Sequence, residues 1–145
     1  KKANYSSLDL TEYMPQEKDR FGLFFVEVKA WDHQRKHDEY DEYYGVSDQR
    51  LILVTDLGVI VKNNADKSHD IFVQSIATGN AVAGATVELL GKNGIALFTG
   101  ITNDKGHVFF TSSKRLVNEK QPTAYIIKTD KDISFIPYKR SSRQI

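Results

Sequence analysis

The sequence predicts an all-β protein, an antiparallel β-sandwich of about seven to nine short strands. Apolar and polar residues alternate with a period of two along much of the chain. Turn-forming residues recur about every 8–12 residues, the spacing typical of sandwiches. Gly, Pro or Asn interrupts the polar stretches within about two helical turns. The alternation of strands and helices that a parallel sheet requires is missing from the sequence.

The first predicted strand covers residues 23–31, LFFVEVKAW. Phe24 and Val26 share one face of this strand, whereas Glu27 and Lys29 point toward water on the other. This pattern predicts a half-buried strand.

The next run, RLILVTDLGVIVK at residues 50–62, is almost continuously apolar apart from Asp56 and Gly58. A break there predicts two strand halves that meet at a bulge or corner. Because a buried carboxylate needs hydrogen-bond donors, we expect Asp56 to accept backbone N–H groups at this bend. A catalytic pair of carboxylates is not predicted, since the same strand carries no second acid.

Six further strands complete the predicted set, at residues 69–78, 84–91, 95–102, 107–112, 123–130 and 132–138. The connections NNADKS and TDKD have the polar composition of turns between antiparallel neighbours. KNG and NDKG place Gly where a hairpin needs a positive φ. One short helical turn is predicted within residues 112–120, with a serine as its cap and Leu116 directed inward.

Composition and charge limit the classes of function. The 145 residues suit one domain, and 40% hydrophobic with 27% charged residues is ordinary for a globular protein. Twenty basic and 19 acidic residues are spread along the chain, so nucleic acid and anionic membranes are not predicted partners. The absence of cysteine excludes disulfides and thiolate chemistry. No apolar run approaches the ~20 residues of a membrane span, so direct membrane insertion is not predicted.

The stretch between Trp31 and Gly45 has the most reactive composition. Candidate metal ligands in it are His33, His37, Asp38 and Glu39. The two histidines stand four apart, which suits a helix, yet no helix is predicted there. Charge runs are more often solvated, so a polar insertion between two strands is the preferred interpretation, and neither a metal nor another cofactor is predicted.

Aromatic residues of the same stretch offer a second candidate site. Trp31, Tyr43 and Tyr44 would form a stacking platform for a sugar, although packing on a sheet edge is the commoner use of such residues. His69 and His107 each begin a predicted strand, where histidines are more often surface or hydrogen-bonded structural residues. No serine lies in a nucleophile elbow, so no catalytic residue and no enzymatic activity are predicted.

The segment ATGNAVAGATVELLGKNGIALFTGITNDKGHVFF, residues 77–110, resembles extracellular β-sandwich modules with the pattern G-x-x-V-x-G-A-x-V followed by T-x-x-x-G. Together with RLILVTDLGVIVK and DIFVQSIATGNAVAGATVELLGKNG, it is similar to a macroglobulin-like domain from the N-terminal half of bacterial α2-macroglobulins, whose fold is immunoglobulin-like. The resemblance covers about residues 20 to 140. The stretch from His33 to Gly45 does not match the family pattern.

The resemblance implies a large periplasmic protein, often a lipoprotein held at the inner membrane, that entraps proteases after they cleave a bait region. Some members carry a Cys-Glu-Gln thioester, for which this chain has no cysteine. The implied role is therefore a non-catalytic structural domain whose partners are neighbouring macroglobulin-like domains and, for the full-length protein, target proteases. An independent carbohydrate-binding or adhesion module is the alternative.

The predicted division of the chain has three parts. Residues 1–20 are a linker or an edge strand from a preceding region, residues 21–140 are the sandwich, and residues 141–145 lead to the next domain. Lacking an initiator Met, the chain has the character of a piece of a longer protein.

Overall fold

The structure is a computed structural model that describes residues 21–29 and 47–138, together with residues 7, 9 and 11. Every strand pair in it is antiparallel, which confirms the predicted all-β class. The nine strands are β1 (Gly22–Lys29), β2 (Ser47–Val54), β3 (Leu57–Asn63), β4 (His69–Ser75), β5 (Thr86–Gly91), β6 (Ala96–Ile101), β7 (His107–Phe110), β8 (Pro122–Lys128) and β9 (Ile133–Pro137).

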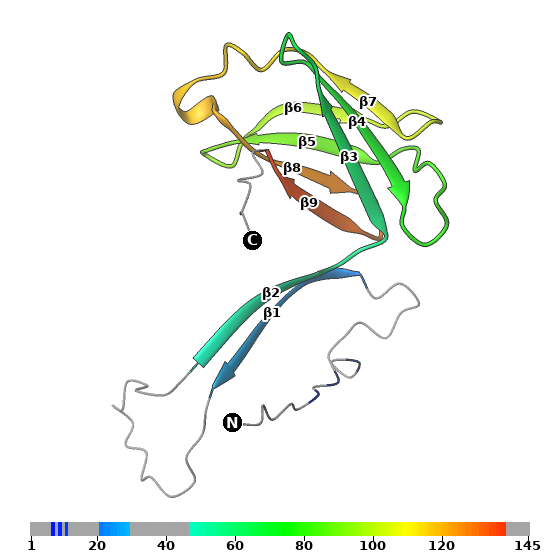
Figure 1. Ribbon diagram of the computed structural model, residues 1–145, viewed down its shortest axis with the longest axis vertical. Helices are drawn as coiled ribbons and strands as arrows, with labels where there is room; N and C mark the ends of the chain where they lie inside the picture. The colour runs from blue at the N-terminus through cyan, green and yellow to red at the C-terminus, as the bar shows by residue number, and fades with distance from the viewer. Residues whose placement is uncertain (1–6, 8, 10, 12–20, 30–46, 139–145) are drawn as a thin grey trace, which may run out of the picture.

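Seven of these strands form the predicted sandwich. A three-stranded sheet in the order β3-β4-β7 lies across a four-stranded sheet in the order β6-β5-β8-β9 (Figure 1). Alternate residues of the central strands point into the space between the sheets, as the period of two requires. The fully buried apolar residues there include Ile71 on β4, Val87 and Leu89 on β5, and Ile127 on β8.

Strands β1 and β2 form a separate two-stranded sheet, which we call the hairpin. It projects away from the sandwich and joins it where β2 leads into β3 (Figure 1). The predicted alternation is present in β1, because Phe24 and Val26 are half-buried while their neighbours are exposed. The boundary placed at residue 21 stays a prediction.

The predicted break in residues 50–62 is confirmed, since β2 ends at Val54 and β3 begins at Leu57. The turn at residues 64–68 joins β3 to β4, with a hydrogen bond of 2.9 Å from the Asn64 amide to the Ser68 carbonyl. The turn at residues 129–132 joins β8 to β9, with the Thr129 amide 2.9 Å from the Asp132 carbonyl. Both hairpins were predicted from their turn chemistry.

The connection NDKG was predicted as a hairpin turn, and this is wrong. Strands β6 and β7 lie in different sheets, so the turn carries the chain from one sheet to the other. Gly106 does have the predicted positive φ, +68°. Its carbonyl accepts a hydrogen bond of 2.8 Å from the Val73 amide, which anchors the turn to β4. At this side of the sandwich the sheets come close, because a Cβ on Gly100 would lie 2.6 Å from Val108 Cγ2.

The predicted helical turn is shorter than expected and lacks the expected serine cap. A 3₁₀ turn, η2, covers Asn118–Lys120, and the residue at its N-cap is Val117, which has no side-chain oxygen to accept a hydrogen bond from a backbone N–H of the turn. Leu116 is half-buried, in agreement with its predicted inward direction. No helix among the described residues has the length and apolarity needed to cross a membrane.

Candidate functional site

The residues predicted as candidate ligands lie outside the described part of the chain. This applies to the metal candidates His33, His37, Asp38 and Glu39 and to the stacking candidates Trp31, Tyr43 and Tyr44. Both proposals therefore stay predictions. Within residues 21–29 and 47–138, no group of three or more His, Asp or Glu side chains is placed to hold a metal ion.

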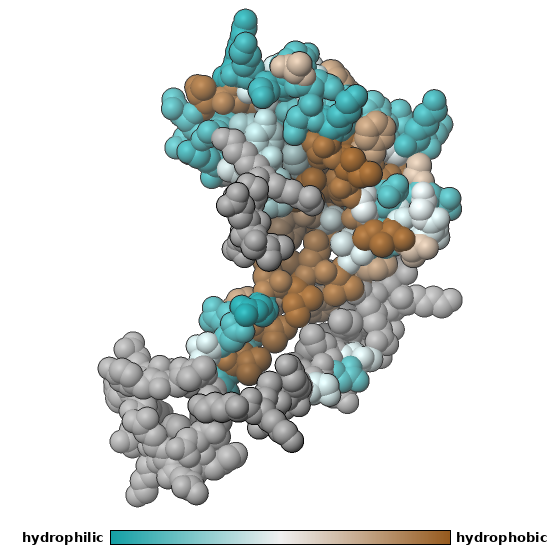
Figure 2. Space-filling view, in the orientation of Figure 1, coloured by the Kyte–Doolittle hydropathy of each residue, from teal (hydrophilic) through white to brown (hydrophobic). Residues whose placement is uncertain are grey.

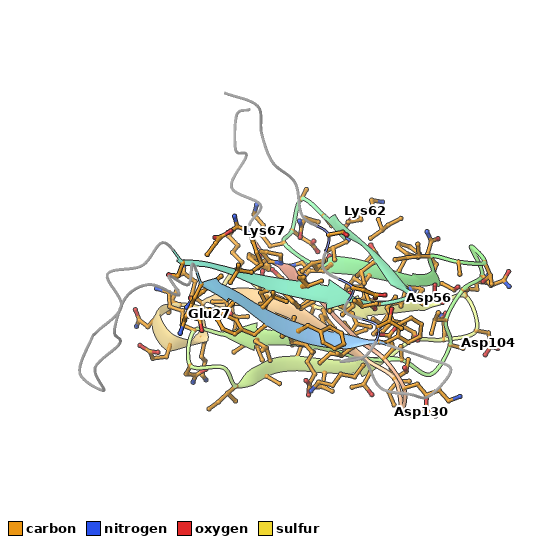
Figure 3. The ribbon with its side chains drawn as sticks, turned by 90° about the horizontal axis from the view of Figure 1, so that it is seen from below. Glu27, Asp56, Lys62, Lys67, Asp104 and Asp130 are labelled. Atoms are coloured by element: carbon orange, nitrogen blue, oxygen red, sulfur yellow. The ribbon has the colours of Figure 1, made fainter. Side chains whose placement is uncertain are left out.

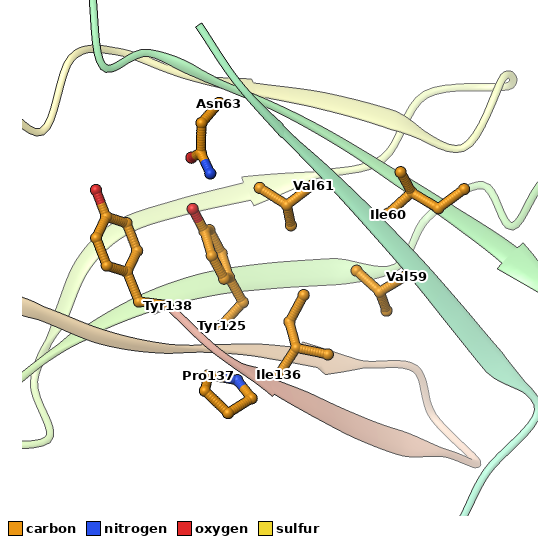
Figure 4. Close-up of a pocket in the computed structure, with 8 residues that line it drawn as sticks. All are labelled: Val59, Ile60, Val61, Asn63, Tyr125, Ile136, Pro137 and Tyr138. Carbon is orange, nitrogen blue, oxygen red and sulfur yellow. The ribbon is translucent and has the colours of Figure 1, made fainter. Parts of the chain in front are cut away.

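A groove lies at the open side of the sandwich, between the edge strands β3 and β9. Its volume is about 430 Å³. The aliphatic side chains of β3 and β9 face two phenol rings across it, those of Tyr125 and Tyr138 (Figure 4). The lining residues are Val59, Ile60, Val61, Asn63, Tyr125, Ile136, Pro137 and Tyr138.

His69 is fully buried at the start of β4. Its ring centroid lies 5.8 Å from that of Tyr125 and 5.5 Å from that of Tyr138. Its Nδ1 is 2.8 Å from the hydroxyl of Tyr125, and its Nε2 is 3.2 Å from the hydroxyl of Ser113. The hydroxyl of Ser113 is in turn 2.9 Å from that of Tyr138. We call these four residues the His69 cluster.

One tautomer of His69 gives the Tyr125 O–H an acceptor, and hydrogen-bond satisfaction favours it. If the Tyr125 hydroxyl donates to Nδ1, then Nε2–H donates to the Ser113 oxygen, and Ser113 donates onward to Tyr138 or to the carbonyl of Lys67. Each polar group then has a partner. Burial lowers the pKa of His69 below its ordinary value of 6.5, although the Asp66 charge opposes this, so the ring is held neutral.

A serine beside a histidine resembles half of a nucleophilic site, so the rest of the arrangement matters. Ser113 is only 6% exposed and His69 is not exposed at all. The group that orients the imidazole is a phenol, whose pKa is itself raised by burial, where a nucleophilic triad has a carboxylate. The cluster thus joins β4, β8 and the segment around Ser113 by hydrogen bonds within the core.

His107, the second strand-initial histidine, pairs with an acid at the surface of the three-stranded sheet. Its Nε2 is 2.9 Å from Asp70 Oδ1, and its ring packs on that of Phe72 with centroids 4.8 Å apart. The side-chain amide of Asn64 donates a hydrogen bond of 2.8 Å to the other carboxylate oxygen of Asp70. The Asn64 bond and then the His107 bond lower the pKa of Asp70 below 3.8. The pair therefore ties the β3–β4 turn to β7.

Asp56 fixes the junction between the hairpin and the sandwich. Its Oδ1 accepts a hydrogen bond of 2.7 Å from the Ala77 amide, which confirms the predicted role of this carboxylate at a bend. Bonds from the Ser75 hydroxyl and from Ala77 lower its pKa. Figure 3 shows Asp56 where β2 gives way to β3.

Asp132 completes this junction, and no pattern in the sequence indicates this role. Its Oδ2 accepts a bond of 2.8 Å from the Asp56 amide, across a separation of 76 residues. The sequence pattern predicts Asp132 only as part of the TDKD turn. In the structure this residue is buried, with 9% of its surface exposed. Nothing in the local sequence distinguishes an aspartate that bonds within its own turn from one that bonds a distant amide.

Comparisons with known proteins agree on one family. The sequence model of the bacterial alpha-2-macroglobulin MG3 domain matches residues 54–144. An alpha-2-macroglobulin homolog of Yersinia pestis is 39% identical over 92% of this chain, and an alpha-2-macroglobulin of Rickettsia conorii is 37% identical over 98%. The chain spans about 7% of the length of these two relatives.

Solved structures of Escherichia coli alpha-2-macroglobulin are similar to this fold. A crystal structure spanning domains NIE-MG1 matches with a TM-score of 0.55 and 26% identity, over 63% of this chain and 41% of that one. A crystal structure spanning MG0-NIE-MG1 matches with a TM-score of 0.57 and 25% identity, over 72% of this chain and 31% of that one.

Proposed function

Because the chain belongs to the bacterial alpha-2-macroglobulin family and folds as a macroglobulin-like β-sandwich within such a multi-domain protein, we propose that it is a non-catalytic structural domain of a protein that traps and inhibits proteases. Its partners are then the neighbouring macroglobulin-like domains of the same polypeptide. Target proteases are partners of the complete protein and not of this domain alone.

The observation that carries the proposal is how the described polar residues are used. His69, Asp56 and Asp132 all bond to groups far away in the sequence, and each bond joins elements of the sandwich. Polar side chains whose hydrogen bonds join separate elements of the fold make a domain rigid. A module of this kind contributes to its protein by its shape and its faces.

We further propose that the complete protein lies in the periplasm, anchored to the inner membrane as a lipoprotein. The support is the family membership of the chain. Fractionation of cells that express the complete gene, followed by immunodetection, should find the protein with the inner membrane. Detection in the cytoplasm would contradict this proposal.

Protease inhibition tests the role of the domain. A broad-specificity serine protease is incubated with the complete polypeptide, and cleavage of a large protein substrate is followed. We expect the complete polypeptide to suppress cleavage and the 145-residue chain alone to leave it unchanged. Introducing Leu89→Asp, at a fully buried position of β5, should abolish the suppression because it disrupts the sandwich.

The matched control is Ile95→Ser, since Ile95 is a large apolar residue that is 63% exposed in the β5–β6 turn. This variant should suppress cleavage as well as the parent does. Suppression by the isolated chain, or full suppression by the Leu89→Asp protein, would contradict a purely structural role within a trap.

A further inference from the structure

The hairpin carries an apolar face that the sandwich does not cover. Leu23 lies directly opposite Leu53, and Phe25 directly opposite Leu51, so all four side chains project on the same side of the ribbon. We call these four residues the leucine–phenylalanine face. Leu23 is 49% exposed, Phe25 64% and Leu51 57%.

The core of the sandwich is complete without this face. Its buried apolar cluster begins at Leu57 and ends at Ile127, and includes no residue of β1 or β2. A two-stranded ribbon is at best marginally stable in water, and contiguous exposed apolar surface commonly marks an interface. Figure 2 shows apolar residues continuing from the sandwich down along the hairpin.

The comparisons place the hairpin in a much longer polypeptide. The sequence model of the MG3 domain matches from residue 54, the last residue of β2, so nearly all of the hairpin lies outside the matched region. Alignments with the two relatives cover 92% and 98% of this chain, and so extend well upstream of residue 54. These relatives are far longer than the chain, which supplies about 7% of their length.

We propose that the leucine–phenylalanine face is the docking surface for a neighbouring domain of the same polypeptide, whose apolar surface it completes. The inference rests on the membership of the chain in a multi-domain family. The far end of the hairpin suits the rim of such an interface. There Glu27 pairs with Lys29 at 3.0 Å and accepts a bond of 2.9 Å from the Gln49 side chain, so polar groups border the apolar residues at that end.

Hydrogen exchange compares the hairpin in two settings, the 145-residue chain and the complete polypeptide. Amides of residues 22–29 and 47–54 should exchange more slowly in the complete polypeptide, by on the order of tenfold or more, because docking opposes local opening. Amides of β5 report the sandwich in both settings and should be equally protected. Equal exchange of the hairpin in both settings would overturn the proposal.

A variant and its matched control separate docking from general stability. Phe25→Ser with Leu51→Ser removes the centre of the face, and Ile95→Ser with Ile101→Ser removes two residues of similar exposure, 63% and 67%, from the sandwich. In the complete polypeptide the first pair should return hairpin exchange to the rate seen in the 145-residue chain. The second pair should leave it slow.

The alternative occupant is a second copy of this chain. Light scattering of the 145-residue chain should give a monomer. A dimer that Phe25→Ser with Leu51→Ser dissociates, with the hairpin protected in the dimer, would overturn the proposal in favour of self-association. Failure of the complete protein to inhibit proteases would count against the proposed function and would leave the exchange result intact, so the two failures are distinguishable.

Discussion

At the scale of single residues, His69 links the two sheets of the sandwich through a buried hydrogen bond. It belongs to the three-stranded sheet, and its partner Tyr125 belongs to the opposite sheet, so their bond of 2.8 Å spans the core. Ser113 adds a third segment through Nε2. The hydrogen bonds of the imidazole thus fix how the two sheets are oriented, which the non-directional apolar contacts of the core do not.

Replacing His69 with Leu should lower the free energy of unfolding by about 1–3 kcal/mol, because the buried hydroxyls of Tyr125 and Ser113 each lose a partner. Urea denaturation of the 145-residue chain measures the change. Adding Tyr125→Phe to the first substitution should restore part of the stability, since removing both partners relieves the unsatisfied hydroxyl. If the loss of unfolding free energy in the double variant equals the sum of the two single losses, the bond across the core is contradicted.

The pH dependence of stability should carry a contribution from His69. Its pKa is depressed in the folded protein, so between that value and 6.5 the unfolded chain binds more protons than the folded one. Stability from this group is therefore complete above about pH 6.5 and falls as the pH is lowered. The carboxyls of Asp56, Asp66 and Asp70, with pKa values below 3.8, should lose their contribution only in more acidic solution.

Thermal melts between about pH 5 and pH 7 measure this effect as the difference between the parent and His69→Leu. The destabilisation caused by the substitution should shrink as the pH falls, because protonation of the exposed imidazole stabilises the unfolded state of the parent, and the variant has no imidazole to protonate. A difference that stays constant across the range would contradict the neutral, buried state of His69.

Asp56 gives a prediction at the junction. Asp56→Ala should lower the melting temperature, because the Ala77 amide loses its acceptor at 2.7 Å. Asp56→Asn should lower it less, since the amide oxygen can occupy the same position. Equal effects of the two variants, measured by thermal melts at pH 7, would indicate that the charge and not the bond is what matters there.

At the scale of elements, the turn at residues 103–106 decides how the two sheets are joined. Gly106 has φ +68°, and a Cβ there would overlap the carbonyl oxygen of Val73 on β4. Gly94, in the β5–β6 turn, has a similar φ of +74°, but a Cβ there would meet nothing within 4 Å. The two glycines share a backbone conformation and differ in their surroundings.

Gly106→Ala should therefore destabilise the chain more than Gly94→Ala. Each substitution incurs the strain of a positive φ, about 1 kcal/mol, and the change at residue 106 adds a steric clash that requires β4 or the turn to shift, for a total of about 2–3 kcal/mol or more. Chemical denaturation of the two variants gives the comparison. Equal losses would show that the turn moves freely away from Val73.

At the scale of the whole molecule, the hairpin and the sandwich differ in how they are stabilised. The sandwich has a buried core drawn from both of its sheets, whereas the hairpin leaves Phe25 and Leu51 more than half exposed. A chain shortened to residues 55–145 should consequently keep a cooperative unfolding transition. Its melting temperature should lie within a few degrees of the parent's, because no residue of the core cluster is removed.

Circular dichroism and thermal melts of the shortened chain carry out this test. Loss of the cooperative transition would show that the hairpin belongs to the sandwich and would favour a domain that begins at residue 21. The 145-residue chain carrying Phe25→Ser provides the control, since it keeps the backbone of the hairpin and removes its most exposed aromatic side chain.

The sequence by itself determined the local features of this protein. Period-two alternation identified strands such as β4 and β5, and Asn, Asp and Gly in the connections identified the turns, because strand pleat and turn φ depend on neighbouring residues alone. Asp56 was identified as a bend residue for the same reason. The polar groups that meet across the fold could not be found in this way, since His69 and Tyr125 stand 56 residues apart.

Only the tertiary structure decided which strands pair and which sheets they join. The turn NDKG has the same chemistry whether its flanking strands pair or separate, and the approach of Gly106 to Val73 settled the matter. Likewise β1 has the alternation of a half-buried strand, yet none of its residues belongs to the buried core of the sandwich. Side-chain direction is a local property, whereas burial depends on what the rest of the chain places opposite.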